Sequence, residues 1–178
     1  MMGRVFFTLA IFLLSGSYAL ADGFYAGANV AVTNMEGSPL GLDFQNRPIG
    51  WKLHAGYEFS DIFALEGSYV DSGEAEDTFL DDSVNVKAQM SGYVMSFVLQ
   101  TAMTTPNLFT KLGYYNGEVE WSLPGVTAKN DEDGFAAGLG FRHEFMNNLA
   151  IRGEVDWYES ELDNLWSVGI GLQFSFGN

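Results

Sequence analysis

The last stretch of the chain constrains the fold most strongly, because large apolar residues alternate there with small or polar ones. The large apolar side chains are Trp166, Val168, Ile170, Leu172, Phe174 and Phe176. The residues between them are Ser167, Gly169, Gly171, Gln173 and Ser175. A β-strand places alternate side chains on opposite faces. The apolar face runs unbroken for about 11 residues, the length that a tilted strand needs to cross a bilayer. The stretch therefore predicts the closing strand of a transmembrane β-barrel.

The first 21 residues have the features of a secretory signal peptide. Arg4 is followed by an apolar run over residues 5–14, and Ala19-Leu20-Ala21 forms a small-x-small cleavage site. The alternative is a membrane-spanning helix, but the apolar run is much shorter than the ~20 residues such a helix needs. We expect residues 1–21 to be the signal peptide and residues 22–178 the barrel domain. No later stretch predicts a spanning helix, and only a closed barrel could satisfy the backbone of strands within a membrane.

Seven further segments show strand-like alternation. Their ranges are 23–32, 49–59, 62–70, 84–99, 108–121, 134–145 and 149–158. With the closing strand they predict an all-β fold, an eight-stranded antiparallel up-and-down transmembrane β-barrel. Polar loops are expected at 33–48, 71–83, 122–133 and 159–163, and generally shorter connections between them. In such barrels the long loops face the outside and the short turns face the periplasm. The alternation slips near Gly92 and Gly117, which predicts irregularities there.

Aromatic residues collect at the two ends of the predicted strands. The predicted aromatic girdle consists of Trp51, Trp121, Trp157 and Trp166 at the outer end, and Phe174 and Phe176 at the periplasmic end. Phe59, Phe63 and Phe145 lie at that same end. Amphipathic rings prefer the two membrane interfaces. A soluble lipocalin-type barrel has no reason to sort its aromatic residues by height, and the remaining alternative is chance placement at strand ends.

Charged residues within the strands lie on the face opposite to the large apolar residues. The predicted interior network consists of Lys52, Glu66, Lys111, Arg142, Arg152 and Glu154. The interior of an eight-stranded barrel is just wide enough for its own side chains. Opposite charges buried there need to pair and hydrogen-bond. The network is interpreted as a structural plug that fills the barrel, and the alternative is an ion path or gate.

Composition and motifs argue against several classes of function. The net charge of −15 is unfavourable for binding nucleic acid. The chain has no cysteine and only two histidines, His54 and His143. Neither histidine has a serine at a neighbouring outward position, as a Ser-His-acid site in the barrel wall requires. No two-histidine metal spacing and no phosphate loop is present. We therefore expect no enzyme activity, no cofactor and no metal site.

Five segments resemble the small eight-stranded outer-membrane barrels of the OmpA transmembrane-domain and opacity-protein kind. They are GFYAGANV, GYEFSDIFALEGSYVD, GLGFRHEF, RGEVDWY and GIGLQFSF. The resemblance implies a location in the bacterial outer membrane, with outer-membrane lipid and lipopolysaccharide as neighbours. Full-length OmpA relatives also carry a peptidoglycan-binding domain, which we do not expect in residues 22–178. It also implies recognition by the barrel assembly machinery, since Gly171, Phe174 and Phe176 match a C-terminal signal of one glycine and two spaced aromatic residues.

The predicted loops at 71–83, 122–133 and 159–163 are rich in acidic residues. They are interpreted as a solvated, self-repelling surface that could contact extracellular surfaces. The alternative is binding of divalent cations, which take carboxylate oxygens as ligands. We expect an outer-membrane barrel with a structural or surface-interaction, adhesion-type role and no catalysis. The main alternative is a small pore or transporter. A third, a soluble lipid carrier, is disfavoured by the charged inward face.

Overall fold

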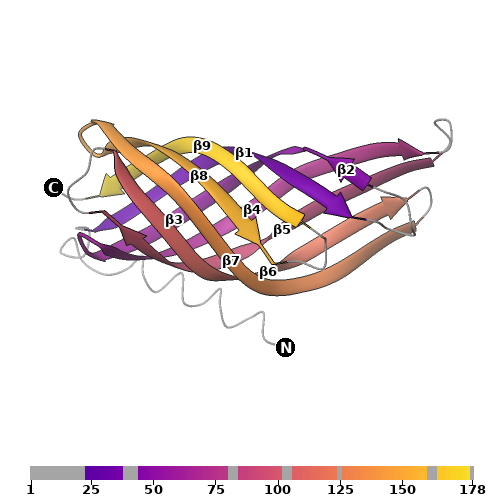
Figure 1. Cartoon of the computed structure of the whole chain (residues 1–178), viewed down its shortest axis with the longest axis horizontal. Helices are drawn as coiled ribbons and strands as arrows, with labels where there is room; N and C mark the ends of the chain where they lie inside the picture. Colours follow the sequence, from indigo (N-terminus) through magenta and orange to yellow (C-terminus); the bar gives the residue numbers. More distant parts are fainter. Residues whose placement is uncertain are drawn as a thin grey trace.

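The computed structural model describes residues 23–37, 44–79, 84–101, 106–123, 126–159 and 164–176. These residues form nine β-strands, shown in Figure 1. The strands are β1 (Phe24–Gly37), β2 (Phe44–Asn46), β3 (Ile49–Ser60), β4 (Phe63–Phe79), β5 (Val84–Gln100), β6 (Asn107–Leu123), β7 (Val126–Met146), β8 (Leu149–Tyr158) and β9 (Asn164–Phe176). Strands β1 and β3–β9 form a closed, antiparallel, eight-stranded barrel, so the predicted fold class is confirmed. The predicted signal peptide lies outside the described residues.

The barrel closes where β9 pairs with β1. The register runs from Phe24 opposite Phe176 to Glu36 opposite Asn164, so the seam is continuous along almost the whole of both strands. This confirms the prediction that the last strand seals the barrel against the first. The short strand β2 pairs only with the far end of β1, beyond the point where β1 leaves β3.

The two ends of the barrel differ. At one end, which we call the turn end, tight turns at Asp61–Ile62 and Asn147–Asn148 join neighbouring strands. Asn148 has φ of 67°, a left-handed conformation that asparagine tolerates better than most residues. At the other end, which we call the hairpin end, β4–β5 and β6–β7 project well beyond the shorter strand β8 (Figure 1).

The outer face of the barrel wall is apolar. Phe97, Ile49 and Leu112 expose 74%, 70% and 67% of their surface. Most other outward positions in the half of the barrel nearer the turn end also carry apolar residues. A contiguous apolar surface of this extent is a membrane or protein contact surface rather than a solvated one. The described residues include no helix long and apolar enough to cross a membrane.

Three of the predicted boundaries are wrong. Residues expected in the loops at 71–83 and 122–133 mostly belong to strands, since β4 continues to Phe79 and β6 to Leu123. Their acidic, glycine-containing composition is typical of loops, but small apolar residues such as Ala75 point inward between outward acids. The predicted loop at 33–48 likewise contains the end of β1 and the strand β2.

The irregularity predicted near Gly117 is absent, and the one predicted near Gly92 lies in the neighbouring strand, opposite Ser91 to Gln89. Strand β5 pairs without a shift through Gly92 and Gly117, and the bulge lies instead in β4, between Asp71 and Glu74. The alternation seemed to slip because the large apolar side chains change face at this height. Tyr93, Met95 and Phe97 point outward, whereas Met90 beyond Gly92 points inward. Both glycines are needed because the ring of Tyr115 lies against them, and a Cβ at either position would come closer than 3.0 Å to it.

Candidate functional sites in the barrel interior and the protruding sheet

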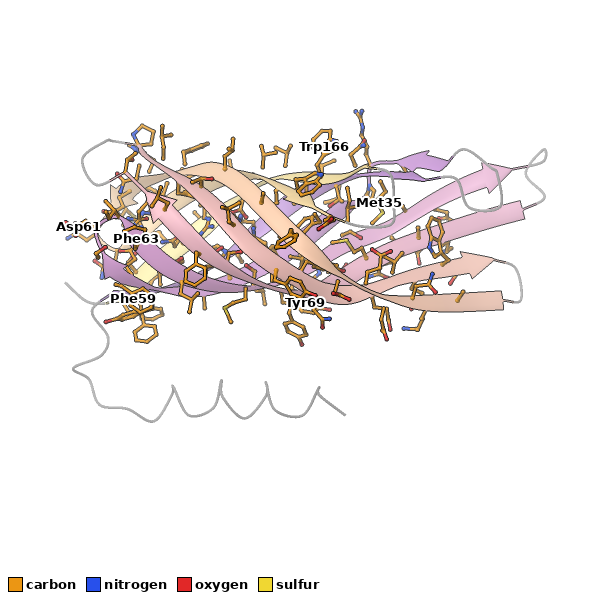
Figure 2. The ribbon with its side chains drawn as sticks, turned by 60° about the horizontal axis from the view of Figure 1, so that its bottom comes forward. Met35, Phe59, Asp61, Phe63, Tyr69 and Trp166 are labelled. Atoms are coloured by element: carbon orange, nitrogen blue, oxygen red, sulfur yellow. The ribbon has the colours of Figure 1, made fainter. Side chains whose placement is uncertain are left out.

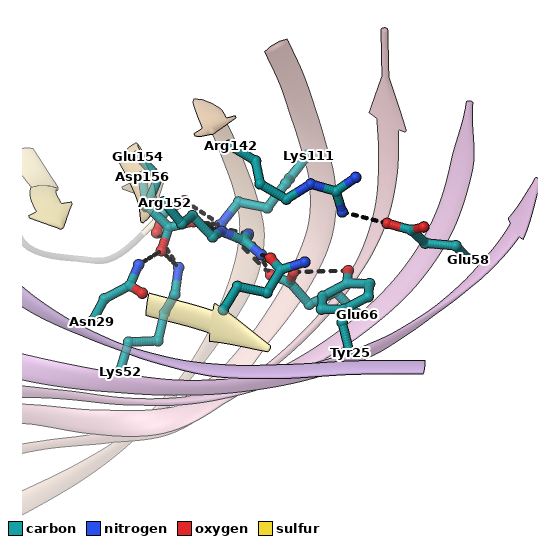
Figure 3. A network of polar contacts seen from close by, with 11 residues as sticks. Tyr25, Asn29, Lys52, Glu58, Glu66, Lys111, Arg142, Arg152, Glu154 and Asp156 are labelled. Atoms are coloured by element: carbon teal, nitrogen blue, oxygen red, sulfur yellow. Dashed lines mark hydrogen bonds and ion pairs between the residues drawn. The ribbon is translucent and has the colours of Figure 1, made fainter. Parts of the chain in front are cut away.

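A buried cluster of charges occupies the interior of the barrel (Figure 3). Arg152 on β8 lies at its centre and donates two hydrogen bonds to Glu66 on β4, at 2.6 and 3.0 Å. It also donates to Glu154 at 3.0 and 3.2 Å. A two-pronged contact of this kind between guanidinium and carboxylate is among the stronger polar interactions in proteins. The arrangement fixes β8 to the opposite wall of the barrel.

Two lysines complete the cluster. Lys111 on β6 lies 2.8 Å from Glu154 and 2.7 Å from Asp156. Lys52 on β3 lies 2.6 Å from Asp156 and also contacts Glu154. Three cations therefore face three carboxylates, and all six side chains are at most 8% exposed. Because the charges balance, the cluster is neutral as a whole.

Polar neighbours satisfy further oxygens of the cluster. Asn29 on β1 donates to Glu154 at 2.7 Å, and the Tyr25 hydroxyl donates to Glu66 at 2.9 Å. Arg152 also donates to the side-chain oxygen of Gln173 on β9, at 3.1 Å. The ring of Phe109 lies 4.4 Å from the Arg152 guanidinium, a cation–π contact. The first strand, β1, and the last, β9, thus both join the cluster, one from each side of the seam.

The structure brings together five of the six residues predicted for the network. Arg142 is the exception: it pairs with Glu58 at 2.5 Å and lies 3.9 Å from Glu144, nearer the turn end (Figure 3). The physical reason is that Arg142 stands directly opposite Arg152 in the β7–β8 register, so the two guanidinium groups repel and point apart. The sixth member of the cluster is instead Asp156, which pairs with Lys52 and Lys111. Its inward position was visible in the alternation of β8.

Above the charges, toward the hairpin end, the interior becomes apolar. Met35, Met90, Tyr115, Val119 and Leu165 are each at most 1% exposed there. The two cavities next to the charge cluster have volumes of about 10 Å³ each, room for about one water molecule. Within the part of the chain that the structure describes, a charged layer and an apolar layer thus lie one above the other in the barrel interior.

Rings form a belt around the outer wall at mid-length. Trp51 packs on Tyr69 at 5.3 Å and Tyr69 on Tyr93 at 5.1 Å, while Trp157 stands opposite Trp166. Figure 2 shows Tyr69 and Trp166 about halfway along the barrel, with Phe59 and Phe63 at the turn end. Sequence reasoning missed the tyrosines of this belt because it considered only tryptophans at the outer end of the strands.

Trp121 does not belong to this belt. It points inward and packs against the apolar cluster around Val119, so its predicted place in the girdle is wrong. Trp121 lies on the same face of β6 as the buried Tyr115, and the strand continues well beyond the height of the belt. The predicted end of the strand was mistaken for the membrane interface.

The distance between the two rings of aromatic residues can be estimated along β9. Ten residue steps separate Trp166 from Phe176. At ~3.3 Å a step and a ~40° tilt they span ~25 Å along the barrel axis, the height of the apolar band in outer-membrane barrels. Phe174 and Phe176 point outward with their rings 5.1 Å apart, and Gly171 faces inward at the seam opposite Asn29. The role of these three residues as an assembly signal stays a prediction.

Beyond the belt, β4–β7 continue as a protruding sheet with an acidic outer face. Lys129 lies 2.6 Å from Glu118 and 2.8 Å from Glu120 on the neighbouring strand, and Lys87 lies 2.7 Å from Glu74. Hydrogen bonds to the two glutamates raise the pKa of Lys129 above its usual range. Further acids on this part of the chain are Asp71, Glu76, Asp131, Glu132 and Asp133. The sheet therefore keeps a surplus of negative charge.

Strand β7 forms an edge of the protruding sheet. Its partner β8 pairs only with the residues from Ala136 to Met146, whereas β7 begins at Val126. Within the described ranges no second strand pairs with the first nine residues of β7. The amide of Glu159 donates to the carbonyl of Phe135 at 2.8 Å, which shows that the backbone groups of Phe135 point to this side. Because backbone groups of alternate residues point to the same side of a strand, the N–H and C=O groups of Asp133, Asp131 and Lys129 also point toward this open edge.

The described residues contain no group of three or more His, Cys, Asp or Glu side chains placed to hold a metal ion. His54 is buried inside the barrel, and His143 is exposed on the outer face near the turn end. Asp81 and Asp82 of the predicted acidic loop lie outside the described residues.

Comparisons with known proteins agree with this architecture. A family model described as "Outer membrane protein beta-barrel domain" matches residues 6–176. No curated protein sequence matches the chain. Among solved structures, Ail, the attachment invasion locus protein of Yersinia pestis in complex with the heparin analogue sucrose octasulfate, is 18% identical with a TM-score of 0.59, covering 87% of this chain and 98% of that chain.

Two further structures are similar. Neisserial surface protein A is 16% identical, with a TM-score of 0.64 and coverage of 87% of this chain and 98% of that chain. The outer membrane protein OprG of Pseudomonas aeruginosa is 12% identical, with a TM-score of 0.63 and coverage of 89% and 98%. At these identities the likeness shows the shared fold.

Proposed function

Because this chain belongs to the outer membrane protein β-barrel domain family and resides in the outer membrane, we propose that it is a non-catalytic surface-interaction protein. The turn end then faces the periplasm and the hairpin end faces the environment. The barrel anchors the protruding sheet, and the sheet makes the contact. The observation that carries the proposal is the open edge of β7 on an acidic sheet held beyond the membrane.

The filled interior supports an anchoring role rather than transport. A conducting barrel needs a continuous polar path, whereas here a neutral charge cluster is covered by an apolar layer that includes Met90 and Tyr115. The cavities beside the cluster hold about one water molecule each. The alternative of a small pore has no comparable support.

The chemistry of the protruding sheet suggests the class of partner. An exposed strand edge can accept an extended peptide as an additional strand, with main-chain hydrogen bonds supplying affinity. The acids on β6 and β7 favour a basic peptide and repel an anionic one. Ail was crystallised with a sulfated heparin analogue, and the acidic sheet of the present chain favours the opposite charge. We therefore infer a lysine- or arginine-rich extended segment of an extracellular protein as the partner.

Binding of a lysine-rich β-forming peptide to the barrel in nanodiscs tests this proposal. We expect saturable binding that weakens with salt, and no binding of a matched glutamate-rich peptide. Asp131→Asn removes one charge, while Asp131→Pro also removes an edge N–H without breaking the ladder to β6. Loss of one main-chain hydrogen bond is worth ~1 kcal/mol, so Asp131→Pro should bind roughly five- to tenfold more weakly than Asp131→Asn.

Two outcomes contradict the proposed mode of binding. If Asp131→Asn and Asp131→Pro bind the peptide with equal affinity, the edge N–H makes no hydrogen bond to the peptide. Attraction between charges would then account for the binding. Absence of binding by the unmodified protein excludes the basic-peptide partner. Glu118→Gln, on a strand paired along both edges, is the matched charge control and should behave like Asp131→Asn.

We propose further that residues 1–21 are removed on export and that the barrel assembly machinery reads Gly171, Phe174 and Phe176. Outer-membrane lipid then surrounds the wall, and lipopolysaccharide surrounds the outer aromatic belt. The intact mass of the protein extracted from outer membranes should correspond to residues 22–178. A mass that includes Met1–Ala21 contradicts the predicted cleavage.

A further inference from the structure

The protruding sheet has a second edge, on β4. Strand β3 pairs with β4 only as far as Asp71, whereas β4 continues to Phe79. Among the strands that the structure describes, only β5 forms a ladder with this last part of β4. Natural proteins normally cover or blunt such an edge, because its unpaired backbone groups can pair with another chain. Since the edge of β7 is open, the state of the β4 edge decides how many extended segments the sheet can accept.

A bulge carries β4 past the end of β3. The register shifts between Asp71 and Glu74, and Gly73 has φ of 74°, a conformation that favours glycine. A Cβ on Gly73 would come closer than 3.0 Å to the backbone oxygen of Ile49, where β3 begins. The amide of Gly73 donates to the Asp71 carboxylate at 2.8 Å, so this backbone group is satisfied within the bulge. Beyond the bulge, β4 lies next to β2.

Strand β2 covers this edge with a side chain. It pairs with the far end of β1 and lies between that end and the β4–β5 hairpin (Figure 1). The side-chain amide of Asn46 donates to the carbonyl of Glu76 on β4 at 2.6 Å and accepts from the amide of Arg47 at 2.6 Å. Such a side chain takes the place of a peptide group in a neighbouring strand. The backbone groups of Glu76 therefore point toward β2, and by alternation those of Thr78 point the same way.

The edge of β4 has the same chemistry as the edge of β7. The side chains of Glu74 and Glu76 are about half-exposed, and Lys87 lies 2.7 Å from the first and 3.8 Å from the second. A basic extended segment would find opposite charges and main-chain partners here as well. On the basis of the function proposed above, we propose that β2 covers a second docking edge for the basic segment, on β4, and leaves β7 as the edge that the partner can reach.

The number of bound peptides tests this cover. The triple variant Phe44→Gly, Gln45→Ser, Asn46→Gly removes the strand propensity of β2 and the amide that reaches β4. Titration calorimetry with the lysine-rich peptide, on nanodiscs that each hold one barrel, should give one more bound peptide for this variant than for the unmodified protein. Adding Thr78→Pro removes an edge N–H of β4 without breaking the ladder to β5. It should weaken the additional site roughly five- to tenfold.

Asn46→Asp is a milder variant of the same kind. A carboxylate cannot donate to the Glu76 carbonyl and repels it, so this variant should also gain the additional site. Asn116→Asp is the matched control, because Asn116 is exposed on β6, a strand that is paired along both edges. It adds the same charge without uncovering an edge, and its number of bound peptides should stay unchanged.

A heat-shift gel establishes that each variant is folded, and Asn46→Asp decides the question if the triple variant is not. Equal numbers of bound peptides on the unmodified protein and on the folded β2 variants overturn the proposal, whatever that number is. Absence of binding by the unmodified protein counts against the open edge of β7 instead. An additional peptide on the β2 variants would still support the cover in that case.

Discussion

Replacing Arg152 by methionine is expected to destabilise the barrel by ~3–5 kcal/mol, the cost of leaving buried charges without their partner. Arg152 is 2% exposed and neutralises Glu66 and Glu154 at the same time. Its loss leaves Glu66 with Lys111 as its remaining cation, at 3.8 Å. Urea unfolding of the protein in lipid vesicles, followed by tryptophan fluorescence, measures the change.

Arg142→Met is the matched control for this prediction. Arg142 carries the same side chain on the neighbouring strand, but it pairs with Glu58, whose side chain is 26% exposed near the turn end. Its substitution should cost about 1 kcal/mol or less. In Arg152→Met, the additional change Glu66→Gln should recover part of the lost stability, because it removes one of the buried charges left without a partner. Equal effects of Arg152→Met and Arg142→Met would show that the central cluster does not hold the barrel together.

Gly171→Ala is expected to lower the stability by ~3 kcal/mol and to reduce the yield of folded barrel, because it prevents close pairing at the seam. A Cβ on Gly171 would come closer than 3.0 Å to the backbone oxygen of Ala28 and to the side chain of Asn29. Both atoms belong to β1, the strand against which β9 closes. The fraction that resists unfolding on an unheated gel, together with urea unfolding, reports the effect.

Gly67→Ala provides the control for this substitution. Gly67 is also a strand glycine, yet no atom lies within 4 Å of the position where its Cβ would be. Its replacement should leave the stability unchanged or raise it by ~0.5 kcal/mol, since alanine has less freedom in the unfolded chain. If Gly171→Ala folds as well as Gly67→Ala, the seam does not require glycine at that position.

The sequence predicts the barrel well because alternation over 10 or more residues is a strong signal. Regular alternation of apolar and polar residues predicts the closing strand, the turn at Asn147–Asn148 and the seam with β1. The protruding parts of β4–β7 were missed because their outer face is acidic and their inner face is small. Glu74, Ala75 and Glu76 alternate like a strand but have the composition of a loop.

The sequence predicted most residues of the charge cluster, but it did not predict which of them pair with each other. Alternation places Arg142 and Arg152 alike on the inward face, but it does not show that they stand opposite each other in the β7–β8 register. Only the register reveals their repulsion. The pairing of Asp156 with Lys52 and Lys111 appears only in the folded barrel.

Conductance in planar bilayers tests most directly the central claim that this is a sealed anchor for a surface-exposed sheet. We predict no steady channel from the folded protein, because the neutral charge cluster and the apolar layer above it block the interior. Steady single-channel currents that disappear when Glu154 is changed to Gln would contradict this account and establish a pore through the charge cluster.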